Sequence, residues 1–185
     1  MKIILASASP RRQVLLANAG FDFETIPADI DETPDPSLNP EQLVASLAEQ
    51  KCQAVFNIMP DGLVIGADTV VAIDGLILGK PSSKAEAFEM LKRLQGRQHT
   101  VYTGVNIKNA NKSYTFVEST KVYMRSLNDD EINNYIATGE PMDKAGSYGI
   151  QERGATLIEK IEGDYFTVVG LPLCRLSLVL KGFEI

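Results

Sequence analysis

A turn rich in hydroxyl and guanidinium groups lies near the start of the chain, over residues 7–12 (Ser-Ala-Ser-Pro-Arg-Arg). Serine followed by proline is typical of a helix start, with Ser9 as N-cap and Pro10 as the first helical residue. The N–H groups and the dipole of such an end favour an anion, and arginine binds phosphate oxygens in pairs. The segment lacks the Gly-Lys-Ser/Thr ending of a P-loop. Two interpretations follow: a capped surface helix with solvated arginines, or a phosphate site that uses Ser7, Ser9, Arg11 and Arg12. Because positive charge opposes the dipole here, removing either arginine is expected to leave the stability of the ligand-free protein unchanged or slightly higher.

Carboxylates and lysines form a second set of candidates. Asp68 follows the apolar residues 63–67, and a carboxylate at the end of a buried strand is a poor core residue unless something pairs with it. Active-site groups often lie at such strand ends in α/β sheets. Lys80 follows a short hairpin beyond Asp68 and could lie near its carboxylate, whereas Lys51 lies in an expected helix. Each lysine taken alone is interpreted as surface charge. The acidic residues 29–32, which end in Glu32, are by themselves a solvated turn.

Two glycine-containing segments are unusual for a compact domain. Residues 138–151 form a polar stretch of fourteen residues with three glycines, and loops of that length are usually functional or disordered. Residues 163–172 predict a turn, a strand and the start of a helix, with glycine for close packing. The only histidine, His99, precedes an alternating strand and is expected at a polar surface or turn. A metal site with several histidines is therefore excluded.

Hydrophobic periodicity and capping signals predict the elements that position these residues. Strands are expected at residues 2–6, 21–26, 63–67, 70–73, 76–78, 100–108, 113–124 and 155–161. Helices are expected to start after Ser9, Asn39, Ser83, and Asn128 or Asp129, and at Pro172. Residues 140–154 are expected to form a loop. Strands alternate with helices in the first half, whereas the long strands after residue 100 require antiparallel pairs, so the sequence predicts an α/β protein with a mixed sheet.

The composition is that of an ordinary globular protein. The 185 residues include 18 basic and 24 acidic side chains, for a net charge of −6. This charge argues against a nucleic-acid partner, which usually demands a basic face, and no run approaches the roughly 20 apolar residues of a membrane helix. The apolar run at residues 1–6 is too short for a signal peptide. Cys52 and Cys174 lie far apart, which fits a reducing cytoplasm.

Five motifs stand in order between residue 3 and about residue 180. They lie at residues 7–12, 66–69, 79–81, 139–151 and 163–172. Together they resemble the Maf family of nucleotide pyrophosphatases. The resemblance implies a single domain over residues 1–185, with two lobes around a central cleft and an elongated mixed β-sheet flanked by helices, similar to inosine-triphosphate pyrophosphatases. It also implies hydrolysis of a nucleoside triphosphate to the monophosphate and pyrophosphate, with a divalent metal ion, Mg²⁺ or Mn²⁺.

A few positions distinguish two groups within this family. Arg11-Arg12, Ala67-Asp68-Thr69 and Ile150-Gln151 resemble the dTTP/UTP pyrophosphatases, whereas members acting on 7-methyl-GTP typically carry Ser-Asp-Gln in place of Ala-Asp-Thr. The resemblance makes Asp68 the proton acceptor and ties Arg11, Thr69 and Gln151 to base specificity.

Two residues depart from the family pattern. Glu152 follows Gln151 where glycine is usual, and Thr167 occupies a place often held by asparagine or serine. The first departure puts the shape of the long loop in doubt, whereas the second is expected to be mild.

The chemistry implied by the resemblance agrees with these residue types. Glu32, Asp68 or both would hold a hard metal ion, and Gln151 could bond the edge of thymine or uracil in both directions. An aspartate carboxyl in water is a weak base at pH 7, so Asp68 must gain proton affinity from its surroundings or act on metal-bound water, and we favour the second. Hydrogen bonds and positive charge for the triphosphate would come from Ser7, Ser9, Arg11, Arg12, Lys51 and Lys80. Lys51 and Lys80 are also assigned, with Asp68, to the catalytic residues.

Two function classes follow from the sequence. The first is a cytoplasmic pyrophosphatase that clears non-standard or excess pyrimidine nucleotides and has no nucleic-acid or membrane partner. The alternative is a nucleotide-sensing regulator of septum formation without relevant turnover. The sequence does not decide between a monomer and a homodimer.

Overall fold

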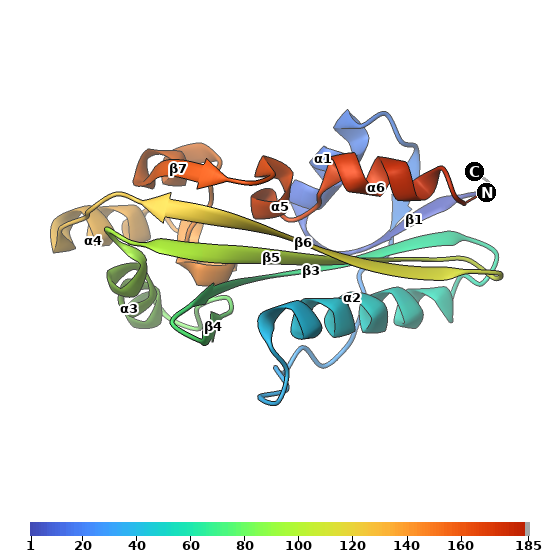
Figure 1. Ribbon diagram of the computed structural model, residues 1–185, viewed down its shortest axis with the longest axis horizontal. Helices are drawn as coiled ribbons and strands as arrows, with labels where there is room; N and C mark the ends of the chain where they lie inside the picture. Colours follow the sequence, from blue (N-terminus) through green and yellow to red (C-terminus); the bar gives the residue numbers. More distant parts are fainter. Residues whose placement is uncertain (184–185) are drawn as a thin grey trace. The chain divides into compact units, whose positions relative to one another are not determined.

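The computed structural model describes residues 1–183 and has a mixed α/β fold. Within these residues one seven-stranded sheet has the order β2-β1-β3-β5-β6-β7, and β4 pairs with β3 (Figure 1). The strands are β1 (Ile3–Ala6), β2 (Phe23–Thr25), β3 (Leu63–Ile73), β4 (Leu76–Leu78), β5 (Gln98–Lys108), β6 (Ser113–Met124) and β7 (Ile158–Glu162). The α-helices are α1 (Pro10–Asn18), α2 (Pro40–Phe56), α3 (Lys84–Leu94), α4 (Asp129–Ala137), α5 (Tyr165–Val169) and α6 (Leu173–Leu180). The expected mixed sheet flanked by helices is confirmed.

The chain divides into two compact units. Unit 1 comprises Met1–Thr69, Thr103–Glu118 and the chain from Gly170 on, and unit 2 comprises Val70–Tyr102 and Ser119–Val169. Strands β3, β5 and β6 contribute residues to both units. The predicted central cleft stays a prediction.

Unit 1 is built on parallel strands covered by helices. Strand β1 pairs in parallel with β2 and with β3, in a register that places Ile3 beside Leu63 and Ala6 beside Gly66. Figure 1 shows α2 against one face of this part of the sheet, and α1 and α6 over the other. The start of α2 follows from its sequence, because Asn39 and Gln42 form a reciprocal capping box around Pro40 at the first position.

Two glycines bring helix α2 close to the sheet. A Cβ atom at Gly66 of β3 would lie 2.5 Å from the carbonyl oxygen of Ala48, and one at Gly104 of β5 would overlap the carbonyl oxygen of Val44. Any larger residue at either position would push the helix away from the strands. The absence of both side chains therefore fixes the depth at which Lys51, on the same helix, approaches β3.

Unit 2 has its own apolar core between its strands, α3 and α4. Its fully or nearly buried members include Leu91 and Leu94 of α3, Val122 of β6 and Ile132 of α4. The β3–β4 hairpin turns at Asp74 and Gly75, with φ angles of 51° and 77°. Both angles are positive, as a two-residue hairpin turn with an Asp-Gly sequence requires.

Three predicted elements differ in the structure. Residues 63–73 form one continuous strand, so Asp68 lies inside β3 and not at a strand end. The expected loop at 140–154 contains short 3₁₀ segments, η1 (Glu140–Asp143), η2 (Ala145–Ser147) and the start of η3 (Glu152–Leu157), and β7 consequently begins later than expected, at Ile158. The strand expected within 163–172 is the short helix α5.

The cause of the last difference is local. The backbone N–H and the hydroxyl of Thr167 both donate to Asp164 Oδ2, at 2.7 and 2.9 Å. Asp164 thereby acts as an N-cap for the apolar residues that follow. Gly170, at φ 118°, ends the helix.

No helix within residues 1–183 is long and apolar enough to cross a membrane.

Candidate functional site

The serine-rich turn and Asp68 meet at one edge of the sheet in unit 1. The last pair between β1 and β3 joins Ala6 to Gly66, and beyond it β1 turns away into residues 7–9 while β3 continues to Asp68. Ser7 Oγ accepts a hydrogen bond from the backbone N–H of Ser9 at 3.2 Å, which closes the turn before α1. Ser9 is the N-cap by position, but its own hydroxyl makes no capping bond. The carboxyl end of β1 therefore lies beside the polar residues of β3.

Arg12 is buried at this edge of the sheet and connects several of its segments by hydrogen bonds. It is 8% exposed, and its guanidinium donates to Gly170 O at 2.7 Å, to Ser7 Oγ at 3.2 Å and to Thr69 Oγ1 at 3.0 Å. Burial lowers the pKa of Arg12 below its ordinary value, and the negative charge of Asp68 opposes that effect. Gly170 leaves room for the group, since a Cβ there would lie 3.4 Å from Arg12 Nε.

For Arg12, these contacts contradict the expectation that removing the arginine leaves the stability of the ligand-free protein unchanged. Arg12 is not a solvated surface residue, because it is buried and its loss would remove a charged donor from three oxygens of unit 1. Arg11 is half-buried in the first turn of α1. The roles of both arginines and of Ser7 and Ser9 toward phosphate stay predictions.

Lys51 lies between two carboxylates. Its ammonium is 2.7 Å from Asp68 Oδ1 and 2.9 Å from Glu32 Oε1, and both Lys51 and Asp68 are buried whereas Glu32 is exposed. A buried lysine or aspartate would be costly alone, so each compensates the other. Sequence reasoning considered each lysine alone as surface charge, and for Lys51 that interpretation is wrong.

The donor set of this cluster fits a small hard cation. The carboxylates of Glu32 and Asp68 both contact the ammonium of Lys51 and so lie near each other. Mg²⁺ in enzymes is commonly held by one or two carboxylates together with substrate phosphates. Within residues 1–183 no third carboxylate, histidine or cysteine joins Glu32 and Asp68 to complete a protein cage. Further ligands would therefore come from water or phosphate oxygens.

Thr69 connects the arginine to β5. Its hydroxyl oxygen accepts a hydrogen bond from Arg12. It also lies 2.9 Å from Thr103 Oγ1, and either of these two hydroxyls can donate to the other. Thr103 is fully buried. The side chain predicted to influence base choice is thus held from two sides.

The remaining predicted residues belong to unit 2. Lys80 is exposed just beyond β4, and Gln151 is half-buried immediately before η3. Glu152, the departure from glycine, has φ 53°. This left-handed conformation is the one that glycine adopts at little cost, which explains the usual residue there. The structure brings Ser7, Ser9, Arg12, Glu32, Lys51, Asp68 and Thr69 together in unit 1, and the joint action of Lys80 and Gln151 with this group stays a prediction.

His99 is a second correction. It lies in β5 at 2% exposure, and its Nε2 is 2.6 Å from the hydroxyl of Tyr148. Tyr148 belongs to the glycine-containing loop and packs in the core of unit 2. The pair therefore fastens that loop to the sheet, where sequence reasoning expected a surface histidine.

Sequence reasoning missed Thr103 and Gly104, which support the cluster in unit 1, and Glu140, which supports the glycine-containing loop in unit 2. Gly104 and Thr103 lie inside an alternating strand pattern, and an isolated glycine in a strand is a signal of close backbone approach. Glu140 was not singled out within the long loop, although its carboxylate accepts hydrogen bonds from three groups. Only the glycine carried a usable signal.

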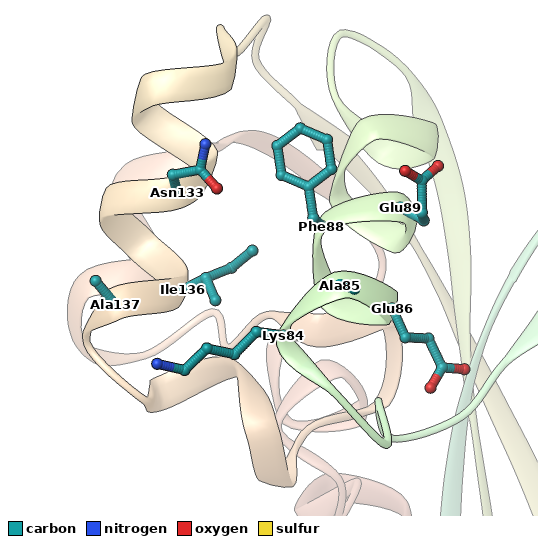
Figure 2. A pocket seen from close by; sticks show the side chains of 8 residues that line it. All are labelled: Lys84, Ala85, Glu86, Phe88, Glu89, Asn133, Ile136 and Ala137. Carbon is teal, nitrogen blue, oxygen red and sulfur yellow. The ribbon is translucent and has the colours of Figure 1, made fainter.

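A shallow groove elsewhere in unit 2 contains none of the predicted site residues. Figure 2 shows its walls, helices α3 and α4, with Phe88 and Ile136 as the larger apolar side chains. The charged Lys84, Glu86 and Glu89 line it as well, and in Figure 2 the carboxylates of Glu86 and Glu89 point away from it. The groove thus lacks the convergent polar groups of a substrate site.

Comparison with known proteins places this geometry in a family. The family model described as Maf-like protein matches residues 2–183. A dTTP/UTP pyrophosphatase of Bacillus anthracis is 52% identical over 184 residues, covering 100% of this chain and 96% of the relative. One of Pelotomaculum thermopropionicum is 50% identical, covering 98% and 96%.

Solved structures share the fold at low identity. The Ham1 protein of Staphylococcus aureus superposes with a TM-score of 0.61 at 15% identity over both full chains. A HAM1 protein of Coxiella burnetii gives 0.52 at 14% identity, covering 98% of this chain and 99% of that one. The fold, the five motifs and the full-length match agree, and this chain belongs to the Maf family.

Proposed function

We propose that this protein is a nucleoside triphosphate pyrophosphatase that hydrolyses dTTP and UTP to the monophosphate and pyrophosphate. The observation that carries the proposal is the identity of 50–52% over essentially the whole chain to relatives of that name. The residues support it, since Arg11, Thr69 and Gln151 match the pyrimidine-type pattern. Of these, Thr69 accepts a hydrogen bond from Arg12, whose charge interacts with that of Asp68.

Asp68 is the proposed proton acceptor. Cleavage between the α- and β-phosphorus needs a positioned water and charge neutralisation but little covalent chemistry. Asp68 Oδ1 is held by Lys51 at 2.7 Å, so the carboxylate is fixed in orientation and its other oxygen, Oδ2, would accept the proton of the attacking water. Lys51 thereby holds the carboxylate in place.

The other residues would bind the substrate. Arg11, Arg12, Ser7, Ser9 and Lys80 are proposed to hold the triphosphate by charge and hydrogen bonds. Gln151 offers one donor and one acceptor to the edge of thymine or uracil. We further propose that Glu32 and Asp68 hold Mg²⁺ or Mn²⁺, which would supply charge stabilisation to the phosphate oxygens.

A cytoplasmic location is part of the proposal. Cys52 is buried and Cys174 exposed, and both are free thiols. Free cysteines of this kind fit a reducing compartment.

The test is a panel of nucleoside triphosphates in which released pyrophosphate is measured directly. We expect dTTP and UTP to be hydrolysed, GTP and 7-methyl-GTP to be poor substrates, and EDTA to stop turnover until Mg²⁺ or Mn²⁺ is added back. Orthophosphate in place of pyrophosphate would show a different cleavage position. Binding of dTTP without turnover would favour the nucleotide-sensing regulator.

A variant pair assigns the catalytic carboxylate. Asp68→Asn is expected to lower kcat at least ~10²-fold, the usual effect of losing a general base. Asp74→Asn is the matched control, because Asp74 is an ion-paired aspartate just beyond the same strand and outside the proposed site. Activity of Asp68→Asn within a few-fold of the control would remove Asp68 from this role.

A further inference from the structure

We infer that Glu140 is a positioning residue for Gln151: its carboxylate fastens both ends of the segment 149–154, which carries Gln151 at its centre. The inference rests on the proposed function, in which Gln151 bonds the pyrimidine edge. All of the residues concerned belong to unit 2.

The carboxylate binds the far end of the segment directly. Glu140 Oε1 accepts a hydrogen bond from the backbone N–H of Gly154 at 3.0 Å, and Oε2 accepts one from the N–H of Arg153 at 3.1 Å. Both donors lie within three residues of Gln151. An ionised acceptor makes such bonds stronger than a neutral one would.

The near end is bound through Tyr135. Its hydroxyl donates to Glu140 Oε1 at 3.0 Å and accepts from the backbone N–H of Gly149 at 3.1 Å. Tyr135 is 5% exposed in α4, and burial together with the charge of Glu140 raises its pKa. The phenol therefore keeps its proton, which it needs in order to donate to the carboxylate while accepting from Gly149.

The segment 149–154 is closely packed against the Glu140 carboxylate and Tyr135. A Cβ atom at Gly154 would overlap the carbonyl oxygen of Gly149 and lie 2.7 Å from the hydroxyl of Tyr135 and 3.0 Å from Glu140 Oε1. The two glycines thus bring the ends of the segment together around the carboxylate. Gln151 and the left-handed Glu152 lie on the loop so closed.

The backbone of Glu140 is itself held in place by hydrogen bonds. Its backbone N–H donates to Thr138 Oγ1 at 3.1 Å, and its carbonyl oxygen accepts from Lys144 Nζ at 2.7 Å. Gly139 before it has φ 78°, which turns the chain after α4. The position of the carboxylate, and with it that of Gln151, is therefore tied to the end of this helix.

The consequence concerns discrimination between bases more than the hydrolytic step. Thymine presents a carbonyl oxygen at C4 and cytosine an amino group, so a glutamine amide held in one of its two orientations distinguishes dTTP from dCTP. A displacement of about 1 Å is enough to lose such a contact. Loss of the Glu140 bonds should relax the choice of base while leaving Asp68 untouched.

The test compares Glu140→Gln with Glu131→Gln. The glutamine side chain in the first variant would keep one acceptor oxygen and place an amide group against an N–H donor, so at least one of the three bonds is lost. Glu131 is the control, since it lies in α4 of the same unit and its carboxylate accepts from Asn128 N at 2.9 Å and Arg125 Nη1 at 2.8 Å, outside the segment. Tyr135→Phe, which removes the hydroxyl that links Glu140 to Gly149, is the second test variant.

Two readouts are measured on the full chain. Hydrogen exchange at the amides of Gly149, Arg153 and Gly154 should accelerate at least about tenfold in Glu140→Gln, the effect of losing one hydrogen bond to a charged group. The ratio of kcat/KM for dTTP to that for dCTP should fall about tenfold, chiefly through KM for dTTP, with kcat at saturating dTTP within about twofold of the parent. Glu131→Gln should change neither readout.

Gln151→Ala separates this inference from the function on which it rests. If Gln151→Ala lowers the dTTP/dCTP ratio and Glu140→Gln does not, the inference is overturned and the proposed function stands. If Glu131→Gln lowers the ratio as much as Glu140→Gln, the effect is general destabilisation and the inference is again overturned. If Gln151→Ala leaves the ratio unchanged, Gln151 does not discriminate between the bases and the inference about Glu140 is overturned. The proposed function is decided independently, by pyrophosphate release from dTTP by the parent protein.

Discussion

The buried His99 makes the stability of this protein depend on pH in a predictable direction. Its Nε2 bonds Tyr148, whereas Nδ1 is buried with no hydrogen-bond partner among the described residues. Protonation would add a second N–H that has no acceptor and would place a charge in the core of unit 2. For this reason burial lowers the pKa of His99 from its ordinary value of 6.5 to about 4.

The magnitude follows from linkage between proton binding and folding. In the unfolded chain the imidazole takes up a proton near pH 6.5, whereas in the folded protein it does so only near pH 4. Stability from this group is therefore fully present above pH 6.5, is lost as the pH falls from 6.5 to 4, and does not change further below 4. The difference of 2.5 units between these values corresponds to about 3 kcal/mol in total, of which about 2 kcal/mol is lost between pH 7.5 and pH 5.

The assay is urea unfolding at pH 7.5 and pH 5, followed by circular dichroism, for the parent protein and for His99→Gln. Glutamine does not titrate, and its amide can still bond the hydroxyl of Tyr148. Titration of the carboxylates is common to both proteins and cancels in the comparison. We expect the parent to lose about 2 kcal/mol more than the variant between the two pH values. An equal loss in both proteins would show that the histidine titrates as it does in water, which would refute the burial argument.

The remaining predictions concern the supports of the candidate site. Arg12→Ala should lower the free energy of unfolding by about 2–4 kcal/mol, because three oxygens lose a charged donor. Arg11→Ala, the control, should change the free energy of unfolding by less than about 1 kcal/mol. Equal shifts in melting temperature for the two variants would contradict the buried role of Arg12. Gly104→Ala should destabilise by more than ~2 kcal/mol, since the new methyl group meets the backbone of α2. Gly79→Ala, where the space is open, serves as its control in the same urea titration, and similar midpoints would argue against the close contact. Glu152→Gly should raise stability or leave it within about 1 kcal/mol of the parent by relieving the left-handed conformation, and a larger loss would show that the glutamate side chain makes contacts of its own.

The elements that local chemistry specifies were predictable from the sequence. Helices α2, α3 and α4 begin where Asn39, Ser83 and Asn128 accept hydrogen bonds from the first helical turn. The hairpin at Asp74-Gly75 has the positive φ angles that its sequence favours. In each case the determining contacts span two to four residues, so a short window of sequence contains the whole cause.

Elements whose cause lies far away in the chain were not predictable in this way. The pattern of β3 breaks at Asp68 and Thr69, because these polar residues interrupt an apolar run. The strand continues through them since Lys51 and Arg12, 17 and 57 residues away, compensate their polarity. His99 is a similar case, because its partner Tyr148 lies 49 residues further on.

The two buried cations of unit 1 are held in opposite ways, and this difference bears on the proposed chemistry. Lys51 faces the carboxylates of Asp68 and Glu32, so its charge is balanced within the protein and its effect is to orient Asp68. The hydrogen bonds that the structure describes for Arg12 go to neutral oxygens of Ser7, Thr69 and Gly170. Arg12 is thus immobilised without being neutralised by a bonded carboxylate, and three of its five N–H groups are used in doing so. A fixed positive charge that needs no reorganisation is what stabilises a phosphate group most effectively. The guanidinium of Arg12 is already fixed in this way in the ligand-free protein. The ammonium of Lys51, in contrast, is bonded to Asp68, the carboxylate that would take the proton.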